Sequence, residues 1–179
     1  MNVFILCTGR CGSTTFIKAA THIKNFTAAH ESRCKFIGNA RFFYPQNHIE
    51  ADNRLSWFLG RLDAIYGCDA WYVHLQRDVT KTAQSFMARW NRGIMKAYRS
   101  EIIMGAGDCK NDEDKLHYCI DYCETVNANI RAFLKDKTNK INFKLECAER
   151  DWPMFWAFIK AEGDYDRSLK EWEIRYNAR

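Results

Sequence analysis

The chain has 179 residues, of which 47% are hydrophobic and 27% are charged, and only two are prolines. This composition excludes a disordered chain and predicts one compact domain over residues 1–179 with a buried core. The formal net charge is +5, and the lysines and arginines are scattered along the chain, which favours an acidic small molecule over nucleic acid as a partner. The oligomeric state stays open.

No apolar stretch is long enough to cross a membrane, and the N-terminus shows neither a basic region nor a small-residue cleavage pattern. We therefore expect no signal peptide, no membrane span and a cytoplasmic location. None of the eight cysteines forms a Cys-x-x-Cys pair, and most lie in apolar segments, as reduced core cysteines do. Cys119, Cys123 and His117 are close in sequence, but His117 and Cys119 would face different sides of a helix, so we expect no metal site.

The first predicted strand, residues 3–6, passes directly into a glycine-containing loop and then into a helix. Two glycines let the backbone turn sharply and bring its N–H groups close to a ligand, while Arg10 adds a forked cation suited to phosphate or sulfate oxygens. The hydroxyls that follow lie in the first turn of the helix. The segment predicts an anion-binding loop formed by Gly9, Arg10, Cys11, Gly12, Ser13, Thr14 and Thr15.

Three other interpretations compete for this loop. The loop of nucleoside triphosphatases needs four residues between its glycines and then a lysine, whereas two residues separate Gly9 from Gly12 and no lysine follows. A cysteine phosphatase needs an arginine six positions after its cysteine, where this chain has Ser13 after Cys7 and Ile17 after Cys11. A glycine turn that binds nothing is the third possibility.

The second predicted strand, residues 26–30, ends at His30 and Glu31. The carboxyl ends of parallel strands meet at the ligand crevice, so both side chains are candidate catalytic bases. Without a catalytic role, Glu31 would be a surface glutamate and His30 a histidine that ends a strand. Residues 34–46 predict a loop over one side of the cleft.

A third strand is expected at 47–51, with Asp52-Asn53 capping an amphipathic helix over 54–66. Residues 71–76 predict a fourth strand that ends at Arg77, and apolar residues at helical spacing predict a helix over 79–90 with Ser85 on its polar face. The basic residues near its end, Arg89 and Arg92 among them, are better interpreted as a solvated surface than as a binding site.

The remaining segments predict a mobile loop over 93–110, a long helix beginning at the Asn111 cap, and a last strand over 141–145. A helix with Pro153 in its first turn and a final helix over 167–176 complete the expected elements.

The loop Gly9-Arg10-Cys11-Gly12-Ser13-Thr14 resembles the 5′-phosphosulfate loop of the sulfotransferase family, and Arg77-Asp78 with Ser85 eight residues after Arg77 resembles its 3′-phosphate site. Val79 stands where many members have proline. The resemblance covers roughly the first 90 residues, and the glycine-rich basic segment common near the family's C-terminus is missing; Lys170, Arg175 or Arg179 could replace it. The resemblance implies a three-layer α/β/α domain around a central parallel sheet, the phosphate-loop-like sulfotransferase fold.

The resemblance also implies the donor 3′-phosphoadenosine 5′-phosphosulfate and a hydroxyl acceptor, a carbohydrate or other small molecule rather than a protein. Arg10 and the loop would hold the phosphosulfate, and Arg77 and Ser85 the 3′-phosphate. The resemblance favours Glu31 as the group that takes the acceptor's proton without a metal, with His30 as the second choice and His48 as the third. Two alternatives stay open: a non-catalytic module that binds such nucleotides, and a small-molecule kinase of the related phosphate-loop fold.

Overall fold

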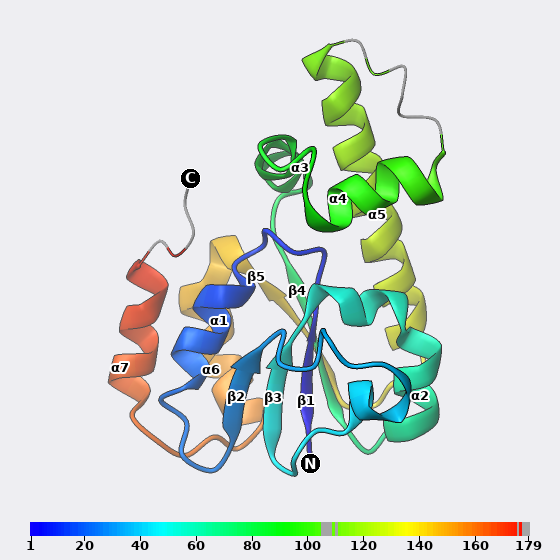
Figure 1. Cartoon of the computed structure of the whole chain (residues 1–179). Helices are drawn as coiled ribbons and strands as arrows, with labels where there is room; N and C mark the ends of the chain where they lie inside the picture. Colours follow the sequence, from blue (N-terminus) through cyan, green and yellow to red (C-terminus); the bar gives the residue numbers. More distant parts are fainter. Residues whose placement is uncertain (105–108, 110, 175, 177–179) are drawn as a thin grey trace.

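A computed structural model describes residues 1–104, 109, 111–174 and 176. At its centre lies a sheet of five parallel strands in the order β2-β3-β1-β4-β5 (Figure 1). Helices cover both faces of this sheet, so the predicted three-layer α/β/α class is confirmed. The strands are β1 (Val3–Leu6), β2 (Thr27–His30), β3 (His48–Ala51), β4 (Trp71–Gln76) and β5 (Lys140–Lys144).

The central strand β1 divides the core into two layers. Its neighbours are β3, with Val3 opposite Ile49, and β4, with Val3 opposite Trp71. All four of its residues are buried, as a continuous apolar run in a parallel sheet predicts. Because side chains alternate along a strand, Val3 and Ile5 enter one apolar cluster and Phe4 and Leu6 the other.

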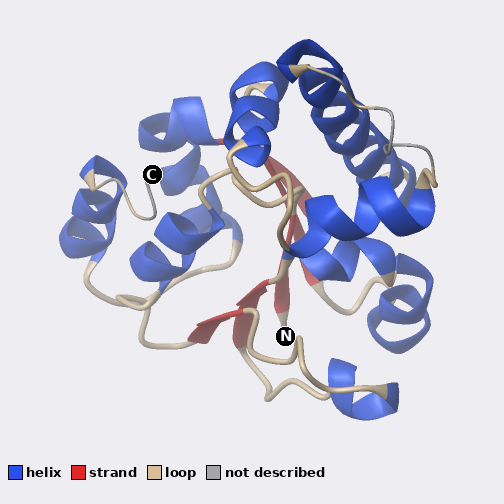
Figure 2. Ribbon diagram, turned by 45° about the horizontal axis from the view of Figure 1, so that its top comes forward, coloured by secondary structure: helices blue, strands red, loops and turns tan. Residues whose placement is uncertain are grey.

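The helices divide in the same way (Figures 1 and 2). On one face lie α1 (Ser13–Ala20), α6 (Ala148–Phe158) and α7 (Tyr165–Lys170). Trp152 and Phe155 of α6 pack around Phe16 of α1. The other face carries α2 (Leu59–Tyr66), α3 (Val79–Met87) and the long α5 (Asp112–Leu134). No helix in the described ranges combines the length and apolarity needed to cross a bilayer.

The prediction of a mobile loop over 93–110 is wrong for residues 93–102. They form α4 (Gly93–Ala97) and the π-helical turn η3 (Tyr98–Ile102), while 105–108 and 110 lie outside the described residues. Met95 and Tyr98 are buried against α5, and the Tyr98 hydroxyl donates to Asp121. Tertiary burial therefore stabilises a helix that the weak sequence period did not reveal.

Other helix boundaries also differ from the expectation, and the helix expected over 79–90 ends at Met87. The helix expected over 54–66 is interrupted at Phe58, giving η2 (Asn53–Trp57) and then α2. The helix containing Pro153 follows η5 (Leu145–Cys147) and begins at Ala148, so the proline lies inside it. The final helix ends at Lys170 and continues as η6 (Glu171–Glu173), and the segment expected as a loop before β3 contains η1 (Gly38–Phe42).

Candidate functional site

The loop between β1 and α1 has the backbone that its glycines predicted. Gly9, Arg10 and Gly12 adopt positive φ angles of 84°, 58° and 91°. The left-handed conformation of Gly12 favours glycine, and a Cβ there would also lie 2.6 Å from Leu145 Cδ1, so that this side chain would have to shift. Gly12 is the N-cap of α1, and no side chain of the described residues caps it. The first turn of α1 therefore suits an anion that accepts from backbone N–H groups.

This loop borders a cavity of about 1110 Å³ at the carboxyl end of the sheet. The loop forms one part of its wall, and the others come from the ends of β2 and β4, from α3 and from the C-terminal segment. The sequence-predicted residues that line it are Gly9, Arg10, Gly12, Ser13, Thr14, Thr15, His30, Glu31, Arg77 and Ser85.

Cys11 is the one predicted loop residue that does not line the cavity. Its side chain is 1% exposed and packs into the core beneath the loop, so a ligand can meet only its backbone. The neighbouring Cys7 thiol donates a hydrogen bond that lowers the pKa of Cys11, while the same contact and burial raise the pKa of Cys7. The buried thiols of Cys7 and Cys11 thus pack beneath the loop and support it.

The two predicted phosphate-binding segments are in direct contact. Arg10 Nε donates to Ser85 Oγ at 2.9 Å, and Arg77 Nη1 donates to the backbone oxygen of Arg10 at 3.0 Å. Burial, followed by repulsion from Arg89 and Arg77, lowers the pKa of Arg10. The guanidinium groups near the loop therefore repel one another, and a bound anion would reduce this repulsion.

Both preferred base candidates line the cavity at the end of β2. His30 Nε2 is 3.0 Å from Ser13 Oγ in the loop. The Glu31 carboxylate is 2.9 Å from Arg54 Nη1, and its backbone adopts a φ of 53° with its N–H donating to Ala51. Arg54 was not identified as a site residue in the sequence, because only the folding of η2 against the end of β2 brings it to Glu31.

A buried carboxylate supports the turn that carries Glu31. Glu50, fully buried on β3, accepts from the backbone N–H of Ser32 at 2.7 Å and from its hydroxyl at 2.6 Å. His48 is 3.0 Å from Glu50 and 2.7 Å from Thr27 Oγ1, and it does not line the cavity. The third-choice base is therefore misplaced for catalysis, because the alternation of β3 directs its side chain toward Glu50.

Asp52 has the capping role that its position predicted. Its carboxylate accepts from the backbone N–H of Arg54 at 2.8 Å and also binds Arg41. Burial raises the pKa of Asp52, which the cap and Arg41 oppose.

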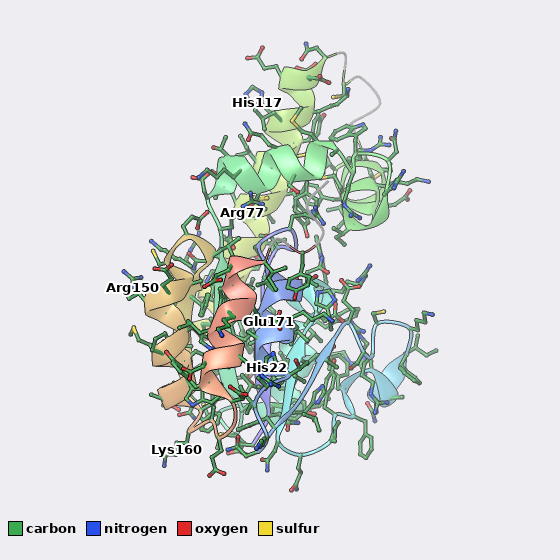
Figure 3. The ribbon with its side chains drawn as sticks, turned by 90° about the vertical axis from the view of Figure 1, so that its left-hand side faces the viewer. His22, Arg77, His117, Arg150, Lys160 and Glu171 are labelled. Atoms are coloured by element: carbon green, nitrogen blue, oxygen red, sulfur yellow. The ribbon has the colours of Figure 1, made fainter. Side chains whose placement is uncertain are left out.

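The C-terminal segment closes one side of the cavity with Trp172, Ile174 and Tyr176, which the sequence did not identify. Trp172 stacks on Phe143 with ring centroids 5.0 Å apart. His22, beyond the end of α1, lies 3.0 Å from Glu171, so the segment is tied to that helix (Figure 3). Of the proposed C-terminal cations, Lys170 is not among the described lining residues, and Arg175 and Arg179 lie outside the described residues.

Within the described ranges, no group of three or more histidine, cysteine or acidic residues is arranged to hold a metal ion. Cys119 and Cys123 are buried in the core, whereas His117 is exposed. Comparisons with models of known protein families, with curated proteins and with solved structures give no match to this chain.

Proposed function

We propose that the chain is a sulfotransferase that moves a sulfuryl group from 3′-phosphoadenosine 5′-phosphosulfate to an acceptor hydroxyl. The proposal rests on one observation: the two segments predicted to bind phosphate are distant in the sequence, yet they line the same cavity. Arg10 and Ser85 are 75 positions apart and are hydrogen-bonded. Both candidate bases line the same cavity.

Each group then has a defined task. The loop N–H groups and Arg10 bind the 5′-phosphosulfate and stabilise the negative charge that builds on the leaving phosphate. Arg77 and Ser85 bind the 3′-phosphate. The acceptor oxygen forms a bond to sulfur as the sulfur–oxygen bond to the phosphate breaks, and the hydroxyl proton passes to Glu31. The products are a sulfate ester and adenosine 3′,5′-bisphosphate.

Glu31 is preferred as the base because its carboxylate is held at the cavity by Arg54 and by the Ser32–Glu50 support. His30 is the second choice, and its bond to Ser13 also suits it to contact the transferred group. In either case no step requires a metal ion.

Thermal unfolding with adenosine 3′,5′-bisphosphate tests the nucleotide site. A ligand bound only by the native state at 100 times its Kd adds about 2.7 kcal/mol, or roughly 5–11 °C in Tm for a chain of this size. ATP with Mg²⁺ should add much less, and an equal shift with ATP would support the kinase instead. Transfer from labelled donor to a metabolite extract then separates an enzyme from a binding module, which would bind the bisphosphate but label no product.

A further inference from the structure

The segment between β2 and β3 exposes several apolar side chains to solvent. Ile37 is 88% exposed and Phe43 is 75% exposed, and Phe36 beside Ile37 is 48% exposed. Ile37 is the N-cap of η1 and Phe43 is its C-cap. Because residues three apart in a 3₁₀ helix lie above one another, Ile37, Ala40 and Phe43 form one exposed stripe. We call Phe36, Ile37, Ala40 and Phe43 the η1 surface.

The turn that carries the η1 surface is anchored by its buried neighbours. Arg41, Phe42 and Tyr44 are buried, and Phe42 and Tyr44 belong to one of the two apolar clusters. Arg41 is bound to Asp52, and the Tyr66 hydroxyl donates to the backbone oxygen of Phe42 at 2.6 Å. In Figure 2 the turn is the short helix at the lower right edge of the molecule. The exposed side chains therefore need little ordering when they meet a partner.

Cations surround the η1 surface. Two guanidinium groups lie over aromatic rings of the segment: Arg33 is 5.1 Å from the centroid of the Phe36 ring, and Arg61 of α2 is 4.7 Å from that of the Phe42 ring. Lys35 is exposed beside them. Within the described part of the chain, none of these three cations forms an ion pair.

No carboxylate of the segment offsets these cations, since residues 32–46 contain no aspartate or glutamate. Three acidic residues of the flanking elements already have basic partners: Glu31 pairs with Arg54, Asp52 with Arg41, and Asp63 with Lys137. The η1 surface therefore combines exposed apolar groups with positive charge that an anionic partner would complement.

We propose that the protein binds the surface of an anionic lipid bilayer through the η1 surface, with Ile37 and Phe43 in the interface and the three cations at the lipid headgroups. Apolar side chains gain free energy at the boundary between headgroups and acyl chains, and cations gain it near anionic lipids. None of residues 32–46 is among the described lining residues of the cavity, so binding would leave the cavity accessible. This inference is independent of the proposed function.

Two other partners fit the η1 surface less well. A stable protein interface buries about 800 Å² on each partner, more than the exposed side chains of one short turn supply. A second copy of the chain would place the same cations against each other in a two-fold contact, which repulsion between like charges opposes. A bilayer requires only exposed apolar groups and nearby basic charge.

Co-sedimentation with vesicles of phosphatidylcholine containing about 30% phosphatidylserine tests the proposal. The parent should bind these vesicles and should bind pure phosphatidylcholine much more weakly. Ile37→Ser/Phe43→Ser should weaken binding by at least about tenfold, because fully burying one such side chain already corresponds to about that factor. The control Ile102→Ser/Met154→Ser removes two exposed apolar side chains elsewhere and should bind as the parent does.

The cations are tested separately. Arg33→Gln/Lys35→Gln should weaken binding to the anionic vesicles by about tenfold or more, since each cation near such a surface contributes about fivefold. The control Arg150→Gln/Lys160→Gln loses the same charge at α6 and just beyond it, away from η1 (Figure 3), and should keep parent-like binding. All four double variants change exposed or half-buried side chains, so a parent-like Tm should accompany each result.

No vesicle binding by the parent would overturn the inference, as would parent-like binding of Ile37→Ser/Phe43→Ser or an equal loss in its control. Release from vesicles by saturating adenosine 3′,5′-bisphosphate would also overturn it, because lipid headgroups would then occupy the cavity. A parent dimer in sedimentation velocity that Ile37→Ser/Phe43→Ser abolishes would assign the surface to a second copy. Failure of the proposed function would leave these expectations unchanged, because no variant alters a described lining residue.

Discussion

Replacing Gly12 with alanine should damage the anion-binding loop more than the fold. At φ 91° and ψ 14° the residue is left-handed, a conformation that costs an L-residue about 1–3 kcal/mol. The added Cβ would also meet Leu145 Cδ1 at 2.6 Å, but this is the flexible end of a half-buried side chain and can shift. Backbone strain therefore costs more than the side-chain clash, and relieving it would turn the loop N–H groups away from the ligand.

For a chain of this size, about 1–3 kcal/mol corresponds to a Tm lower by about 2–12 °C, measured by calorimetry. Binding of adenosine 3′,5′-bisphosphate to Gly12→Ala should fall much further, by at least about tenfold, since several backbone donors act together. Gly60→Ala is the matched control: this exposed residue lies in α2, its new Cβ would meet no described atom within 4 Å, and alanine favours the helix by about 0.5–1 kcal/mol. Parent-like bisphosphate affinity in a folded Gly12→Ala protein would refute the loop as the anion site.

Three further predictions follow from individual side chains. Arg77→Ala should weaken the bisphosphate by about 1.5–3 kcal/mol in calorimetry, with Arg150→Ala unchanged, because one charge-assisted contact is lost; parent-like affinity would contradict the 3′-phosphate assignment. Glu31→Gln should reduce single-turnover transfer by roughly 10²–10⁴ with donor affinity kept, and His30→Asn should do less; the reverse order would make His30 the base. Burial lowers the pKa of His74, so the unfolded state binds more protons and the free energy of unfolding should fall as pH drops below about 6.5. Urea unfolding of His74→Gln should show a flatter pH dependence, and an unchanged one would exclude this cause.

The sequence determined the position of the first strand and of the loop because both depend on local patterns, whereas the class of the fold was implied by the family resemblance. The run Val3–Leu6 is apolar at every position, as a central parallel strand requires, and the two glycines after it are needed where the backbone is left-handed. The ends of β2 and β4 could also be placed in advance, since parallel strands end at one edge of the sheet.

Only the tertiary structure decided which side chains share the cavity. His48 begins β3 and Glu31 follows the end of β2, and the structure buries His48 against Glu50 while Glu31 meets Arg54 from a different turn. Arg89 could not be distinguished in the sequence from a solvated surface residue, because only the fold brings the turn after α3 to the cavity that the loop lines. A local pattern records which backbone a segment favours, whereas the composition of a site depends on contacts between segments that are distant in the chain.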